Sequence, residues 1–225
     1  MSLNKKRLKA AIFDMDGVIT NTMPDHYRAW SRVFHEAGIP LTREEIYLRE
    51  GQQGARSLRE IFSVKGKSCS KRQLRKMLDD KEAMFKRIVK VRFIPGARQW
   101  IKALHRHGVR LALVTGTSRH EMQRILPKSL REMFDVIITG NDVRHGKPDP
   151  EPYRKAVRKL GISAREGIVV ENAPLGIQSA TAAGLACYAI STSLPRRYLH
   201  GAKKVFPTIK ALRAHVAFFS NGNGV

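Results

Sequence analysis

The sequence predicts an α/β fold in which a helical insertion interrupts a parallel sheet after its first strand. Short apolar runs recur along the chain, each followed by a turn signal and a helical stretch, and this alternation is typical of buried parallel strands. Such runs are missing from residues 21–91, where apolar residues recur at helical spacing instead. We therefore expect a discontinuous core domain, residues 1–20 and 92–225, with an all-helical domain inserted at 21–91. The predicted strands are residues 10–13, 110–114, 136–138, 167–170 and 185–190.

Helices are expected between these strands and throughout the insertion. Residues 96–107 and 152–160 carry apolar side chains at helical spacing, and Gly161 follows the second segment as a C-cap. An insertion of about 70 residues is too long for a loop. Its two connections to the core, residues 20–23 and 91–95, are the candidate hinges. Residues 220–224 are expected to fray.

The composition indicates a globular protein with an unusual charge. The 225 residues include 42 Lys and Arg against 19 Asp and Glu, a net charge of +23. Hydrophobic content of 42% argues against disorder, and no apolar run is long enough for a signal peptide or a membrane span. Cys69 and Cys187 are far apart, which argues against a disulfide framework or a zinc site. We expect a soluble, cytoplasmic protein.

The positive charge alone fits two kinds of partner. Lys and Arg attract the phosphates of nucleic acid and those of a small phosphorylated substrate equally well. No basic stretch interleaved with aromatic residues and no nucleic-acid motif is evident in the sequence. Nucleic acid is therefore not the expected partner, and the choice depends on the motifs.

The first motif is a pair of carboxylates, Asp14 and Asp16, directly after the first predicted strand. In extended chain these two side chains point the same way, and at the carboxyl end of a parallel strand they face the usual ligand crevice. Two charges so close need a cation or a shared proton, and Mg²⁺ is common in phosphate sites. An EF-hand loop does not fit because Val18 is apolar. We interpret Asp14 as a nucleophile that forms an aspartyl-phosphate and Asp16 as the general acid/base.

Three further motifs follow later predicted strands. Thr115 and Gly116 offer a hydroxyl and backbone N–H groups suited to a phosphate. Lys147 lies in a Gly-Lys-Pro-Asp-Pro turn, and Glu171 and Asn172 offer oxygens where a metal would lie. Each alone has an ordinary explanation, a helix cap or a solvated lysine. Their order along the chain is what favours one phosphoryl-transfer site.

Together these motifs resemble those of the haloacid dehalogenase (HAD) superfamily, and within it the branch of β-phosphoglucomutase and related phosphatases with a helical cap. The resemblance covers nearly the whole chain and implies a Rossmann-like three-layer α/β/α core. It implies Mg²⁺ held by Asp14, the main-chain carbonyl of Asp16 and one or both of Glu171 and Asn172. By the same resemblance, Thr115 and Lys147 bind the transferring phosphoryl group, and Gly116 beside Thr115 is a further candidate for binding the substrate. The residues that show the family resemblance are Asp14-Met15-Asp16-Gly17-Val18-Ile19, Thr115, Lys147 and Glu171-Asn172.

One departure from the family concerns the metal. Many relatives have Asp at the position of Asn172, and the amide removes one negative charge. Glu50, in the segment Glu50-Gly51-Gln52-Gln53-Gly54, is a candidate replacement ligand that reaches the metal when the cap closes. The alternative is a solvent-exposed glutamate at a helix end.

The insertion offers three candidate substrate-binding residues, His26, Arg56 and Lys81. Cap cations in this family often contact the distal part of the substrate, and His26 follows the first hinge, where it would reach Asp16 or the substrate. The alternatives are surface charge for Arg56 and Lys81 and helix packing for His26.

The predicted function is that of a Mg²⁺-dependent phosphohydrolase acting on a small phosphorylated metabolite or pyrophosphate. A sugar phosphomutase is the alternative, and the core motifs do not separate the two. A dehalogenase is disfavoured because it needs no Mg²⁺ and would not explain the paired Asp14 and Asp16. We expect a monomer or weak dimer.

Overall fold

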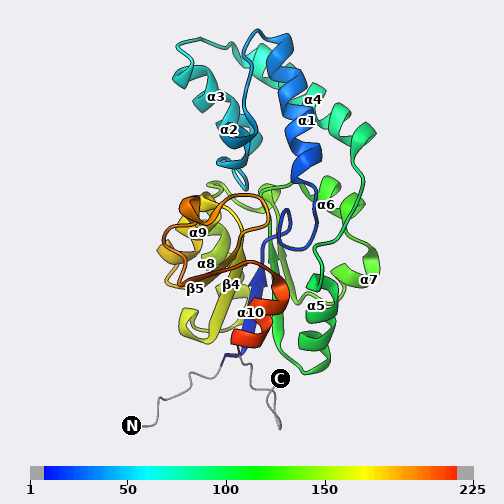
Figure 1. Ribbon diagram of the computed structural model, residues 1–225, viewed down its shortest axis with the longest axis vertical. Helices are drawn as coiled ribbons and strands as arrows, with labels where there is room; N and C mark the ends of the chain where they lie inside the picture. The colour runs from blue at the N-terminus through cyan, green and yellow to red at the C-terminus, as the bar shows by residue number, and fades with distance from the viewer. Residues whose placement is uncertain (1–7, 217–225) are drawn as a thin grey trace.

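A computed structural model of the chain describes residues 8–216. Its centre is a six-stranded sheet with the order β3-β2-β1-β4-β5-β6, and every neighbouring pair is parallel. Helices cover both faces of the sheet, and the helices of the insertion gather at one end of it (Figure 1). The strands are β1 Ala10–Phe13, β2 Arg110–Val114, β3 Val136–Ile138, β4 Gly167–Glu171, β5 Ala186–Ile190 and β6 Lys204–Phe206.

The central strand β1 shows why the fold has three layers. All four of its residues are fully buried, and successive side chains of a strand point to opposite faces. Ala10 and Ile12 join one apolar cluster, together with residues of α8 (Glu151–Leu160) and α9 (Pro174–Ala182). Phe13 joins the other, together with residues of α5 (Ala97–Arg106), α6 (Arg119–Ile125) and α10 (Ile209–His215). The predicted three-layer α/β fold is confirmed.

The predicted strands all occur, with ends that differ by at most one residue, but β6 was not expected. The predicted helices correspond to α5 and α8, and Gly161 caps α8 in the left-handed region with φ 63°. Short elements complete the core: α7 Lys128–Arg131 and the 3₁₀ turns Gly140–Asp142, Ala164–Glu166 and Arg196–Tyr198.

The insertion contains only helices, with α1 and α4 side by side (Figure 1). Its two connections to the core pair with each other: the N–H of Asn21 donates to the carbonyl of Arg92 at 2.7 Å, and that of Ile94 to the carbonyl of Ile19 at 2.9 Å. The exact domain boundaries and the hinge role of these connections stay predictions. The helices are α1 Met23–Glu36, α2 Arg43–Tyr47, α3 Gly54–Val64 and α4 Lys71–Ile88.

Within residues 8–216, no helix combines the length and the apolar character needed to cross a membrane. The predicted fraying of residues 220–224 concerns a segment outside the described residues.

Candidate active site

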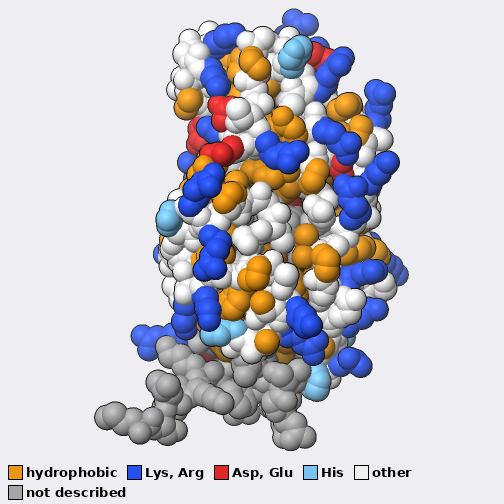
Figure 2. All heavy atoms as spheres, in the orientation of Figure 1, with side chains coloured by type: hydrophobic (Ala, Val, Ile, Leu, Met, Phe, Trp, Pro, Cys, Tyr) orange, Lys and Arg blue, Asp and Glu red, His pale blue; other side chains and the backbone are white. Residues whose placement is uncertain are grey.

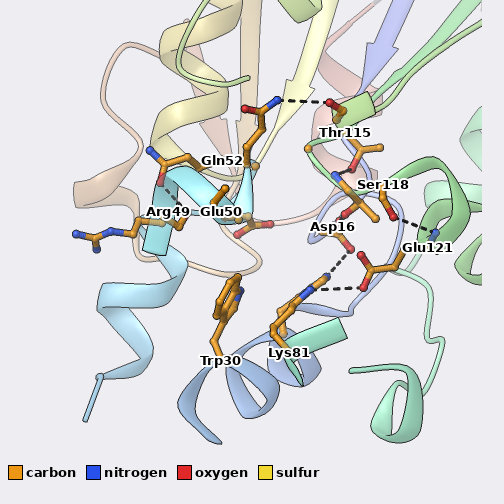
Figure 3. A pocket seen from close by; sticks show the side chains of 18 of the residues that line it. Asp16, Trp30, Arg49, Glu50, Gln52, Lys81, Thr115, Ser118 and Glu121 are labelled. Carbon is orange, nitrogen blue, oxygen red and sulfur yellow. Dashed lines mark hydrogen bonds and ion pairs between the residues drawn. The ribbon is translucent and has the colours of Figure 1, made fainter. Parts of the chain in front are cut away.

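A cavity of about 270 Å³ lies between the carboxyl ends of the core strands and the helical insertion. Asp14 and Asp16, which follow β1, line it from the core, and Trp30 and Lys81 line it from α1 and α4 (Figure 3). The parallel sheet creates this position, because all its strands end at the same edge. The two carboxylates predicted from the sequence therefore line one cavity.

Asp14 is held by a buried lysine from a distant turn. The Nζ of Lys147 lies 2.6 Å from Oδ1 of Asp14, 2.6 Å from Oε1 of Glu171 and 3.3 Å from the carbonyl of Val114. Burial raises the pKa of Asp14 to about 8, although the charge of Lys147 opposes the rise. Burial would lower the pKa of Lys147, but Asp14 and Glu171 outweigh it and raise that pKa. Lys147 thus stays a cation beside Asp14.

Glu171 is fully engaged by protein donors. Besides Lys147, the hydroxyl of Tyr153 donates to its Oε1 at 2.8 Å, and the backbone N–H groups of Asn172 and Ala173 donate to its Oε2 at 2.9 and 3.3 Å. Gly176 packs so closely that any Cβ there would overlap this carboxylate. The geometry suits Glu171 for fixing Lys147.

Asp16 sits among three hydrogen-bonding side chains, of which His26 was predicted to reach it and Thr22 and Thr117 were not. Thr22 donates to its Oδ1, Thr117 donates to its Oδ2 at 2.9 Å, and Nε2 of His26 lies 3.5 Å from Oδ1. His26 in turn stacks on Phe85 with ring centroids 4.0 Å apart. Burial would raise the pKa of Asp16, but His26 and the two hydroxyls outweigh it, so the pKa is lowered. Thr22 lies in the predicted hinge, residues 20–23, and Thr117 directly follows Thr115 and Gly116, and these positions were the available signal.

Two of the three phosphate-binding candidates, Thr115 and Gly116, line the same cavity, and the third, Lys147, contacts Asp14 beside it. Thr115 and Gly116 follow β2, and the Oγ1 of Thr115 accepts a hydrogen bond from the N–H of Thr117 at 3.1 Å. A Cβ at Gly116 would overlap the backbone of Gly51, which belongs to the loop between α2 and α3. The insertion therefore lies in contact with the core at this point.

Glu50 and Asn172 meet across the same contact. The Nδ2 of Asn172 donates to Oε1 of Glu50 at 2.7 Å and to Oγ of Ser193 at 2.9 Å. The other oxygens of the pair, Oε2 of Glu50 and Oδ1 of Asn172, are buried without a hydrogen-bond partner. Burial, with a further contribution from Asp14, raises the pKa of Glu50 well above its ordinary value. The alternative, a solvent-exposed Glu50 at a helix end, is wrong, because the residue is only 5% exposed.

These oxygens fit a hard cation. Unpartnered buried carboxylate and amide oxygens beside crowded carboxylates are ligands that Mg²⁺ accepts. Among the described residues, no three His, Cys, Asp or Glu side chains form a metal cluster by themselves. The donor set would therefore mix carboxylate, amide and main-chain oxygens.

A family model described as haloacid dehalogenase-like hydrolase matches residues 11–190. That span begins in β1 and ends with β5, so it contains the insertion and every motif described above. The chain belongs to the haloacid dehalogenase-like hydrolases.

Named relatives of this hydrolase include phosphatases and a mutase. It is 31% identical over 183 residues to a phosphorylated carbohydrates phosphatase from Thermotoga maritima, across 79% of this chain and 82% of the relative. It is 30% identical over 195 residues to hexitol phosphatase A from Escherichia coli, across 84% and 85%. A solved structure from Bacteroides vulgatus, provisionally named as a β-phosphoglucomutase, has a TM-score of 0.85 and 31% identity, and the match covers 94% of this chain and 88% of that one. The predicted superfamily and enzyme class, a HAD-like phosphoric ester hydrolase, are confirmed.

The three cap residues predicted to bind substrate differ in whether they line the cavity. Lys81 lines the cavity, with its Nζ 3.5 Å from Oε1 of Glu121 and 5.6 Å from the ring centre of Trp30. Arg56 instead pairs with Glu60 at 2.8 Å, is 46% exposed and does not line the cavity. The substrate roles of Lys81, Arg56 and His26 stay predictions, but Lys81 and His26 line the cavity and Arg56 does not. Sequence reasoning missed Glu121, which has no motif around it.

Proposed function

We propose that this hydrolase is a Mg²⁺-dependent phosphatase of a small phosphorylated metabolite and that it works through an aspartyl-phosphate on Asp14. The observation that carries the proposal is the shared cavity: Asp14 and Asp16 both line it, and Lys147 lies 2.6 Å from Asp14. Because Lys147 engages Oδ1, the other oxygen of Asp14 is left for attack. The cavity volume of about 270 Å³ suits a metabolite rather than a macromolecule.

The reaction would proceed in two displacements at phosphorus. In the first, a carboxylate oxygen of Asp14 forms a bond to phosphorus, the bond to the leaving oxygen breaks, and Asp16 gives that oxygen a proton. In the second, Asp16 takes a proton from a water molecule whose oxygen attacks phosphorus, and the bond to Asp14 breaks. Lys147, Thr115 and the backbone at Gly116 would stabilise the equatorial oxygens.

The lowered pKa of Asp16 favours its role as a base over its role as an acid. Its hydrogen bonds with Thr22, Thr117 and His26 favour the ionised carboxylate. That form suits the second displacement, where Asp16 is a base. For the first, Asp16 must carry a proton, so substrate binding would have to alter these contacts.

The proposed metal ligands are Asp14, the main-chain carbonyl of Asp16, Asn172 and Glu50. The unpartnered oxygens of Asn172 and Glu50 support this set, whereas the oxygens of Glu171 already accept protein hydrogen bonds. Bound Mg²⁺ would neutralise charge on the transferring phosphoryl group and would favour the ionised form of Asp14, whose pKa burial otherwise raises to about 8. Glu171 would act through Lys147 instead.

The test is phosphate release from a panel of sugar phosphates, sugar-alcohol phosphates, nucleotides and pyrophosphate, with and without Mg²⁺. The parent is expected to release phosphate from at least one ester, and Asp14→Asn to lose that activity by ~10³-fold or more. Asp79→Asn, at an exposed position of α4, is the matched control and should be fully active.

Two results would contradict the proposal. Equal activity of the parent and Asp14→Asn would reject the nucleophile. Isomerisation of a sugar phosphate that needs a bisphosphate activator, with little free phosphate, would favour the mutase alternative. The expected cytoplasmic location and monomeric or weakly dimeric state stay predictions.

A further inference from the structure

A buried ion pair connects the helical insertion to the core at the cavity wall. Lys81 of α4 and Glu121 of α6 are each 7% exposed, and their Nζ and Oε1 atoms lie 3.5 Å apart. Both line the cavity that Asp14 and Asp16 line, and Figure 3 shows the two side chains directed toward each other beneath Asp16. The pair is separate from the Lys147 cluster that holds Asp14.

The charge balance of this wall decides what part of a substrate it can accept. A dianionic second phosphate gains most from a cation that is free to form charge-assisted hydrogen bonds with it, but the Lys81 charge is matched by Glu121. Arg49 also lines the cavity, yet its guanidinium donates to the carbonyl of Glu45 at 2.7 Å and points away from the cavity in Figure 3. Glu82 adds a further negative charge to the lining.

The same wall is suited to hydroxyl groups. A hydroxyl both donates and accepts, and Lys81 and Glu121 supply a donor and an acceptor side by side. Trp30 lies beside them, with its ring centre 5.6 Å from Nζ of Lys81, and offers an apolar surface to the C–H groups of a polyol.

We propose that Glu121 is a specificity-determining residue that neutralises Lys81, and that it thereby selects a leaving group bearing uncharged hydroxyls over one bearing a second phosphate. The inference rests on the proposed phosphatase function and goes beyond it in naming the residue that excludes a bisphosphate. A purely structural role, joining the insertion to the core, is the competing explanation.

The test measures binding in an Asp14→Asn background, so that turnover does not interfere. The probes are fructose 1-phosphate and fructose 1,6-bisphosphate, which differ in the second phosphate, and calorimetry gives a Kd for each. The Asp14→Asn protein should prefer the monophosphate. Adding Glu121→Gln leaves Lys81 uncompensated, so the preference should shift toward the bisphosphate by about tenfold or more.

Three further variants make the result specific. Adding Lys81→Met to Glu121→Gln should abolish the gain for the bisphosphate, because the released cation is gone. Glu121→Asp retains the charge and should retain the monophosphate preference even if Glu121→Gln folds poorly. Glu132→Gln, at a side chain that is 62% exposed, makes the same charge change elsewhere and should leave the preference unaltered.

The proposed role of Glu121 is rejected if adding Glu121→Gln lowers the thermal midpoint of the protein but leaves the ratio of the two Kd values within about twofold of that in the Asp14→Asn protein. That result would leave the pair a structural contact. It would not affect the proposed function, which fails separately if Asp14→Asn hydrolyses esters as fast as the parent.

Discussion

Single residues of the site differ in how many partners their oxygens have. Every oxygen of Glu171 accepts a protein hydrogen bond, whereas one oxygen each of Glu50 and Asn172 is buried without a partner. A buried unpartnered oxygen costs free energy unless a ligand satisfies it. This contrast indicates that Glu171 orients Lys147, whereas Glu50 and Asn172 are suited to binding a cation.

Glu50→Gln is expected to weaken Mg²⁺ binding by about tenfold or more, since it removes a negative charge that compensates for the neutral Asn172. Titration calorimetry with Mg²⁺ alone measures this without substrate. Glu60→Gln, the same change on the surface of α3, is the control and should bind Mg²⁺ as the parent does. An unchanged affinity in Glu50→Gln would remove Glu50 from the proposed ligand set.

Gly176→Ala is expected to destabilise the fold by about 1–3 kcal/mol, because its methyl group would overlap the carboxylate of Glu171 in a packed interior. Ala has the higher helix propensity, so a purely local view predicts the opposite sign. Denaturant unfolding distinguishes the two. Gln178→Ala, at an exposed position of the same helix, should change the free energy of unfolding far less.

The sequence predicted which residues reach the site when a motif marked them. Asp14, Asp16, Thr115, Lys147 and Asn172 fall at strand ends or in a stiff turn, and the topology brings them together. Glu121 was missed because its role depends on Lys81, forty residues earlier on another domain. Such a pairing depends on how the insertion lies on the core, and no local pattern encodes it.

Individual elements carry their own stabilising interactions, of which α2 is a clear case. Thr42 and Glu45 form a capping box at its start, and Nζ of Lys65 from the end of α3 lies 2.6 Å from Oε1 of Glu45. The hydrogen bond from Lys65 and that from the N–H of Thr42 lower the pKa of Glu45 from 4.5 to about 2. These contacts make the stability of this short helix depend on pH.

The contribution of Glu45 should be complete above pH 4.5 and lost as the pH falls through about 2, because the folded state then no longer gains from the ionised carboxylate. The side chain is 31% exposed, so we expect only about 0.5–1 kcal/mol at neutral pH. The measurement is the difference in unfolding free energy between parent and Glu45→Gln across this range. A difference that does not shrink toward pH 2 contradicts the assignment, and Glu132→Gln should give almost none at any pH.

The strands of the core were predictable to the extent that they are buried. Strands β1, β2 and β4 are apolar runs flanked by turn signals, which the parallel sheet requires. Strand β6 was missed because it begins with an exposed lysine, so no continuous apolar run marks it. The other edge strand, β3, is equally short but was predicted because all three of its residues are apolar.

The whole molecule is positive outside and acidic inside its cavity. Figure 2 shows Lys and Arg side chains spread over both the insertion and the core on the visible face. The cavity, by contrast, is lined by more carboxylates than cations: Asp14, Asp16, Glu50, Glu82 and Glu121 against Arg49 and Lys81. The net charge of +23 therefore does not act by lining the site with cations. The net charge instead acts on the substrate as a long-range electric field, which salt screens.

Such a field predicts that salt weakens the encounter between enzyme and substrate but leaves the later steps of the reaction unchanged. Raising KCl from about 20 mM to about 500 mM, at fixed saturating free Mg²⁺, should lower kcat/KM for a phosphate ester several-fold, because screening removes attraction of the anionic substrate. The value of kcat at saturating substrate should change little, since the buried contacts of Lys147 with Asp14 and Glu171 are shielded from salt. A kcat/KM that is flat across this range would show that the excess charge does not guide the substrate. A parallel fall in kcat would instead locate the salt effect in the chemical step.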